Sequence, residues 1–108
     1  GIVEMMGGNP EQAVHAASHC LQNVMGLVCD PIAGLVEVPC VKRNVIGTVN
    51  AMSCADMTMA GIFSRIPPDQ VIDAMKEVGD KMDSSLRETA LGGLAQTPEG
   101  VRIASQIF

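Results

Sequence analysis

Four cysteines, at positions 20, 29, 40 and 54, are the residues whose side chains could do the most distinctive chemistry. None of them forms a Cys-x-x-Cys pair, so neither a zinc ribbon nor a thioredoxin-like redox motif is present. In a reducing cytoplasm the four thiols would be free or would bind a metal. Cys20 and Cys54 fall within predicted helices, where a free cysteine usually packs as a small apolar residue. Cys29 and Cys40 lie in the segment 26–40.

The segment 26–40 carries these two cysteines and has no regular periodicity, because two prolines and two glycines interrupt it. It is unusually apolar for a loop, so we expect it to lie inside the protein. A buried loop must find hydrogen-bonding partners for its backbone. The sequence thus predicts an ordered, apolar, cysteine-bearing loop with something organised around it.

Helical spacing of apolar residues dominates the rest of the chain and predicts an all-α fold, a compact helical bundle. Asn9 can cap a first helix over about 10–24, with Pro10 at its first position and Gln12 placed for a capping box. A second helix is expected over about 39–65. A third follows the prolines at 67 and 68, and a last short helix begins near Pro98. With no Trp or Tyr and eight Met, the core must close with aliphatic side chains.

The predicted helix over 39–65 is apolar or small nearly all round, which is typical of a helix at the centre of a bundle. Its polar residues would then be buried or nearly so, and would need partners or a ligand. These residues are Asn44, Thr48, Asn50, Ser53 and Asp56.

The histidine pair and Asp30 each allow a structural interpretation as well as a functional one. His15 and His19 are four residues apart, a spacing that can hold a metal on one helix face, but no third ligand is evident. Asp30 either caps the loop or orients the neighbouring Cys29. Packing and local hydrogen bonding are the simpler readings for all three.

The formal net charge of −5 and the absence of a basic patch argue against nucleic acid as a partner. No apolar run is long enough to cross a bilayer, and the N-terminus lacks the pattern of a signal peptide. A soluble, cytoplasmic protein without a membrane or nucleic-acid partner is expected.

Residues 29–44, CDPIAGLVEVPCVKRN, resemble the signature of bacterial iron-sulfur L-serine dehydratases. The likeness extends over almost the whole chain. It includes residues 9–16, the helix after Ile66, the segment Leu86-Arg87-Glu88-Thr89, and Gly92-Gly93-Leu94-Ala95.

This resemblance implies a lyase of amino-acid degradation and gluconeogenesis that converts L-serine to pyruvate and ammonia. A [4Fe-4S] cluster would act as a Lewis acid, without pyridoxal phosphate. Cys29 and Cys40 match two of the family's three cysteine ligands, and the third lies upstream of this region. Residues 1–108 would thus be the C-terminal portion of the cluster-binding domain, a fragment of a larger helical catalytic domain that is inactive alone. The missing upstream part or a partner subunit would complete it, and a homo-oligomer is expected.

Substrate contacts are expected from three residues near these motifs. Arg43 can grip a carboxylate through paired hydrogen bonds, with Asn44 beside it. Their structural alternatives are an ion pair for Arg43 and loop carbonyls for Asn44. Arg87 and Glu88 belong either to the surroundings of the substrate and cluster or to an ion pair that braces a turn. Nothing in the sequence fixes the catalytic base or a preference for serine over threonine.

Two alternative interpretations compete with the enzyme. In the first, the chain is a stable but catalytically incomplete helical fragment or an interaction subunit with no cluster of its own. In the second, it is a metal-free helical binding module in which Cys29 and Cys40 are buried thiols.

Overall fold

The computed structural model describes residues 1–107 and confirms the all-α prediction, because this part of the chain holds helices and no strand. The chain divides into two compact units. The helical unit comprises Gly1–Gly26 and Ile46–Asp80, and the cysteine unit comprises Leu27–Val45 and the residues from Lys81 onward. No helix in the described range is both long enough and apolar enough to span a bilayer. The elements are α1 (Ile2–Met5), α2 (Pro10–Val24), the 3₁₀ helix η1 (Ile32–Gly34), α3 (Cys40–Met59), α4 (Pro68–Lys81), η2 (Ser84–Leu86), η3 (Gly93–Gln96) and α5 (Pro98–Ile107).

The start of α2 has the predicted capping box. Gln12 N donates to Asn9 Oδ1 at 2.9 Å, and Asn9 N donates to Gln12 Oε1 at 2.8 Å. Pro10 occupies the first helical position, where its missing N–H costs nothing. The predicted helix over 10–24 is thus confirmed at both ends.

Helix α3 ends at Met59, six residues before the predicted end near Arg65. Gly61 has φ of +93°, and its N–H bonds to Thr58 O while Ile62 N bonds to Met57 O. These two bonds form a Schellman cap, which needs a residue that tolerates the left-handed conformation. The prediction was wrong here because the apolar residues after Gly61 continue the helical spacing without continuing the helix.

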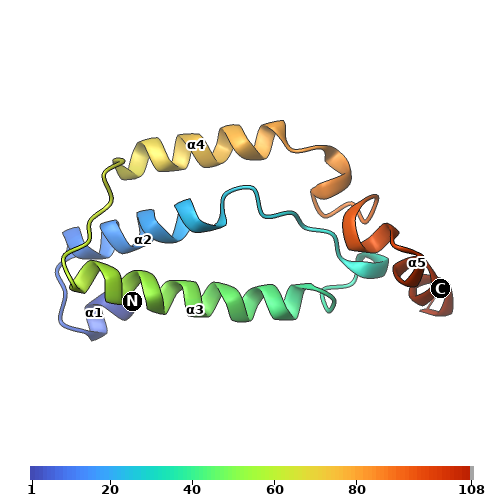
Figure 1. The fold of residues 1–108 in the computed structure, drawn as a ribbon, viewed down its shortest axis with the longest axis horizontal. Coiled ribbons are helices and arrows are strands. Elements are labelled where there is room, and N and C mark those ends of the chain that lie inside the picture. The colour runs from blue at the N-terminus through green and yellow to red at the C-terminus, as the bar shows by residue number, and fades with distance from the viewer. Residues whose placement is uncertain (108) are drawn as a thin grey trace. The chain divides into compact units, whose positions relative to one another are not determined.

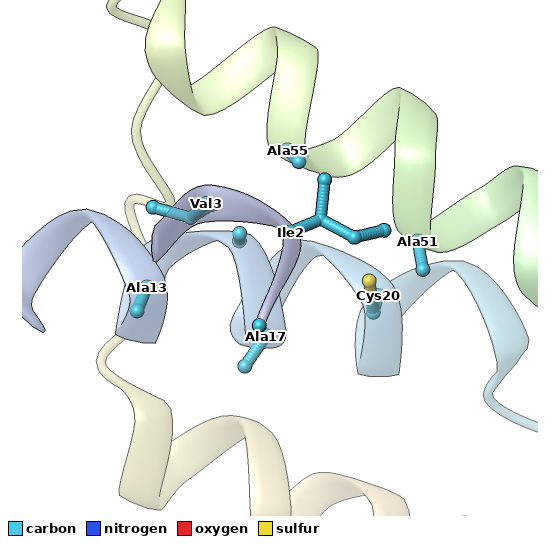
Figure 2. Close-up of a pocket in the computed structure, with 9 residues that line it drawn as sticks. Ile2, Val3, Ala13, Ala17, Cys20, Ala51 and Ala55 are labelled. Carbon is cyan, nitrogen blue, oxygen red and sulfur yellow. The ribbon is translucent and has the colours of Figure 1, made fainter. Parts of the chain in front are cut away.

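The helical unit places α2 between α3 and α4 (Figure 1). Its small core contains Val3, Ala16 and Ala55, from α1, α2 and α3. A pocket of about 180 Å³ opens beside this core, and Figure 2 shows Ile2 and Val3 of α1 facing the alanines of α2 and α3 across it. Alkyl groups and the Cys20 thiol line it, so it offers no charged side chain to a polar substrate.

The two histidines of α2 hold the segment between α3 and α4. His15 Nδ1 accepts from Ser64 N at 3.2 Å, and His19 Nε2 lies 2.9 Å from Ile62 O. The His15 ring also packs on Phe63, with ring centroids 4.7 Å apart. Each histidine therefore has a main-chain partner, as the structural reading expects.

The prediction that α3 is buried at the centre of a bundle was wrong within the described residues. Only Cys54, Ala55 and Thr58 of this helix are buried. Val49 and Met52 are 56% and 54% exposed, because α1 and α2 cover one side of the helix only. The polar residues expected to be buried are exposed or half-buried: Asn44, Thr48, Asn50, Ser53 and Asp56.

The thiols of Cys20 and Cys54 belong to a polar network between α2 and α3. Asn23 Nδ2 donates to Cys54 Sγ at 3.4 Å, Cys54 Sγ donates to Asn50 Oδ1 at 3.4 Å, and Asn50 Nδ2 donates to Cys20 O at 3.3 Å. Burial, with help from the hydrogen bond and the charge of Cys54, raises the pKa of Cys20 from 9.0 to about 11. Cys20 therefore stays a neutral thiol at physiological pH.

We predict that replacing Asn9 by Ala lowers the free energy of unfolding of the chain by about 1 kcal/mol, because the first turn of α2 loses its side-chain acceptor. Asn9→Asp keeps an acceptor and serves as the control, with a much smaller expected change. Urea denaturation followed by circular dichroism measures both. Equal stability of Asn9→Ala and the unchanged chain would contradict the capping role.

We also predict that Cys20 resists alkylation in the native state. At pH 8 a thiol with a pKa of about 11 is about 0.1% thiolate, against about 9% for a pKa of 9.0, so iodoacetamide should react about 100-fold more slowly than with the unfolded chain. The rate should rise tenfold per pH unit as the pH approaches 11. Peptide mapping by mass spectrometry measures it, and similar native and unfolded rates would disprove the shift. Cys54→Ser should raise the native rate.

Candidate functional site

Cys29 is held through its own backbone by a segment far along the chain. Cys29 N donates to Leu86 O at 2.9 Å, and Glu88 N donates to Cys29 O at 2.8 Å. The two bonds form a single parallel bridge between Cys29 and Arg87. Both main-chain groups of this cysteine are therefore satisfied within the cysteine unit, and the position of its Cα is set by residues 86–88.

Asp30, directly after Cys29, is a buried carboxylate with 2% exposure. Arg43 Nη1 of α3 lies 2.5 Å from Asp30 Oδ1, and Leu94 N of η3 donates to Asp30 Oδ2 at 2.6 Å. Burial by itself favours the neutral acid, but the bonds from Leu94 and Arg43 outweigh it and hold the pKa of Asp30 below its ordinary value. Asp30 is therefore an ionised hub that joins three segments of the unit.

Gly93 makes the close approach to Asp30 possible. A Cβ atom at position 93 would lie 2.8 Å from the Cβ of Asp30, which is closer than real carbon contacts, and Gly93 has φ of +60°. Only a glycine meets both conditions without strain. Gly93 is thus required by the Asp30 carboxylate 63 positions away, which the sequence by itself does not reveal.

Arg43 and Asn44 follow the structural alternatives that the sequence left open. Arg43 Nη1 also donates to Val28 O at 2.8 Å, in addition to its ion pair with Asp30. Asn44 Nδ2 donates to Cys40 O at 2.9 Å, within the first turn of α3. Both side chains therefore have protein partners at the cysteine loop.

Cys40 is the first residue of α3, and both it and Cys29 are partly exposed. Burial raises the pKa of Cys29, and the negative charges of Glu88, Cys40 and Asp30 raise it further, whereas Arg43 lowers it. Cys40 and Cys29 are thus within electrostatic reach of each other. A metal ion that bound here would displace the thiol protons.

The loop is ordered as predicted but is less buried than expected. Asp30, Pro31 and Pro39 are buried, whereas Val36 is 67% exposed and Val38 is 47% exposed. Its backbone finds partners locally and in residues 86–88, as in the bond from Ile32 N to Val38 O at 3.0 Å. Because these bonds satisfy the main chain, the loop does not need to be covered, and the expectation of a wholly interior loop was wrong.

Arg87 is exposed, and within residues 1–107 its guanidinium forms neither a hydrogen bond nor an ion pair. The ion pair with Glu88 that the sequence allowed is thus not formed there. Glu88 has φ of +65°, a conformation unusual for a residue other than glycine. The sequence allowed Glu88 a place beside the cluster or an ion pair with Arg87, and in the structure the charge of Glu88 raises the pKa of Cys29.

Cys29 and Cys40 are the two cysteines of the cysteine unit, and they lie within electrostatic reach of each other. Over residues 1–107, no three side chains among His, Cys, Asp and Glu are grouped so that they could hold a metal ion. His15 and His19 lie in the other unit and already have partners.

Comparison with known proteins identifies the relatives of the chain. The family described as "Serine dehydratase alpha chain" matches residues 1–95. The "Probable L-serine dehydratase, alpha chain" of Bacillus subtilis (strain 168) is 61% identical over 99% of this chain and 36% of its own length. The corresponding protein of Latilactobacillus sakei is 58% identical over 98% of this chain and 51% of its own length. "L-serine dehydratase 1" of Escherichia coli (strain K12) is 44% identical over 88% of this chain and 21% of its own length.

No solved structure matches the chain. The chain spans between about a third and a half of the length of the two alpha chains, and about a fifth of the longer enzyme. The family match nevertheless includes the whole cysteine loop and the segment that holds Cys29. By this family match and these relatives, the chain belongs to the serine dehydratase alpha chain family.

Proposed function

We propose that the chain is the C-terminal, cluster-binding portion of an iron-sulfur enzyme that converts L-serine to pyruvate and ammonia. Cys29 and Cys40 would be two of the three protein ligands of a [4Fe-4S] cluster. The observation that carries this proposal is the meeting of these two thiols, within electrostatic reach, on a loop whose backbone is tied to a second family motif. Family membership supplies the reaction class.

The chemistry of the two donors fits such a cluster, because iron-sulfur clusters are held by cysteine thiolates. The thiols are partly exposed, and the Arg43 guanidinium beside Asp30 favours negative charge at Cys29. When bound, the cluster supplies an open iron that polarises the serine hydroxyl as a Lewis acid. The protein's own part is to fix two thiolates and to leave space beside them for the amino acid.

We further propose that the third thiolate comes from outside this chain, and that the chain alone is catalytically incomplete. Residues 1–107 hold no group of three metal-binding side chains, and the alpha-chain relatives are about two to three times as long as the matched region. The exposed apolar residues on α3, among them Val49 and Met52, give the rest of the enzyme a surface to cover. The missing partner would be further sequence of the same enzyme or a second subunit.

For the substrate carboxylate we propose Arg87 in preference to Arg43. Arg43 is occupied by Asp30 and Val28, whereas the exposed Arg87 is bridged through its backbone to Cys29. A guanidinium can bind a carboxylate through two parallel hydrogen bonds. Asn44, one turn after Cys40, remains a candidate for a polar contact.

The ligand assignment predicts that Cys29→Ser and Cys40→Ser, made in the complete enzyme, each lower the iron and sulfide content by at least about tenfold, since even the loss of an outer hydrogen bond costs that much affinity. Pyruvate formation from L-serine should fall with it. Cys20→Ser is the matched control, because that thiol lies in the other unit, and it should retain the cluster. Normal iron content in both loop variants would exclude their role. Anaerobic reconstitution of the isolated chain should yield no active cluster.

The substrate assignment predicts that Arg87→Lys raises the KM for L-serine about tenfold or more with a smaller change in kcat, because charge is kept and the paired hydrogen bonds are lost. Steady-state kinetics of the complete enzyme at equal iron content measures both constants. An unchanged KM would remove Arg87 from the substrate site.

A further inference from the structure

The Arg43 guanidinium contacts the chain on both sides of Cys29. Its Nη1 atom donates to Val28 O at 2.8 Å and to Asp30 Oδ1 at 2.5 Å. The backbone groups of Cys29 itself are bonded to residues 86 and 88. Residues 28, 29 and 30 are thus each held by a hydrogen bond to another segment, so the position of Cys29 is constrained on both sides.

The same arginine is attached to the second cysteine. Arg43 lies three residues after Cys40, on the first turn of α3, so that the two residues share one helical surface. The ion pair between Arg43 and Asp30 therefore links the helix that begins with Cys40 to the loop residue that follows Cys29.

We propose that Arg43 and Asp30 are positioning residues that set the separation between the Cys29 and Cys40 sulfur atoms. The inference deepens the proposed function and rests on it, because it assumes that the two thiols bind one cluster. It gives Arg43 a role in holding the ligands, in place of the substrate contact that the sequence suggested. It also explains the burial of a carboxylate next to a ligand, since a buried hydrogen-bonded charge has few alternative positions.

Leu94 completes this arrangement. Its N–H holds Asp30 Oδ2 at 2.6 Å, so the carboxylate cannot rotate to follow Arg43 without losing that bond. Gly93 admits the carboxylate to this place because it has no Cβ. The two carboxylate oxygens of Asp30 thus have separate partners. Because Leu94 holds Oδ2, the Oδ1 atom stays directed toward Arg43 of α3.

The test uses the 108-residue chain without metal and a short reagent that bridges two thiols. The quantity measured is the ratio of the Cys29–Cys40 bridged product to the product attached at one of these cysteines, found by peptide mapping. This ratio reports how readily the attached reagent reaches the second cysteine, and it does not depend on how fast the first thiol reacts. Variants are Asp30→Asn, Arg43→Gln and both together. Asp83→Asn is the matched control, because Asp83 accepts from Ser85 N in an exposed turn of the same unit.

We expect each single variant to lower the bridging ratio about fivefold or more, and the double variant to lower it no further, because both changes remove one interaction. The control should not change the ratio. Circular dichroism shows whether each variant is folded. If a variant is unfolded, Arg43→Lys is used in its place, because it keeps a positive charge beside Asp30 but lacks the planar guanidinium. An unchanged ratio in the folded variants would overturn the proposal.

A second arm uses the complete enzyme carrying Asp30→Asn or Arg43→Gln, with iron and sulfide content and the electron paramagnetic resonance spectrum of the reduced cluster as readouts. We expect lower content and an altered spectrum. Normal content and an unchanged spectrum would reject the positioning role even if bridging falls. Failure of the proposed function is recognised separately, because Cys29→Ser and Cys40→Ser would then retain iron whatever the bridging ratio of the apo chain.

Discussion

A carboxylate that is closed off from water must be surrounded by hydrogen-bond donors, and this requirement at Asp30 organises the cysteine unit. The charge is met by a guanidinium from α3 and an amide from η3, so three segments that are distant in sequence are held at one point. Each partner constrains its neighbourhood in turn. Position 93 must lack a side chain, and Arg43 must stay on the first turn of α3. Removing Arg43 would leave the buried carboxylate without its counter-ion, which is far more costly than losing a surface ion pair.

The backbone bonds of Cys29 join two separated motifs within the family likeness. The stretch from Cys29 to Asn44 supplies both thiols, whereas residues 86–94 supply the main-chain groups that hold the first of them. Neither stretch satisfies its own polar groups alone. Each motif supplies hydrogen-bonding partners for the other. A substitution at position 88 or 93 would therefore disturb the backbone of the cysteine loop, although neither residue is a candidate ligand.

Local signals predicted the helices well, because caps and periodicity are written within a few residues of where they act. The capping box of α2 is the clearest case, and the Schellman glycine at position 61 was present in the sequence but was given too little weight. The pairing of Asp30 with Arg43 and Leu94 could not be assigned from sequence, because nothing local selects partners 13 and 64 residues away. The exposure of α3 was missed for a different reason. Its apolar composition shows that the helix can be buried, but not that the present chain contains enough neighbours to bury it.

The physical contrast between the two pairs of cysteines bears on which of them can bind metal. Cys20 and Cys54 lie in helices, and burial together with the neighbouring Cys54 raises the pKa of Cys20 to about 11, which favours the neutral thiol. Burial also raises the pKa of Cys29, but Arg43 lies within electrostatic reach and lowers it. A ligand cysteine must lose its proton when metal binds, and a nearby cation lowers that cost. The arginine that orders the loop therefore also lowers the pKa of Cys29, although burial and the charge of Glu88 raise that pKa on balance.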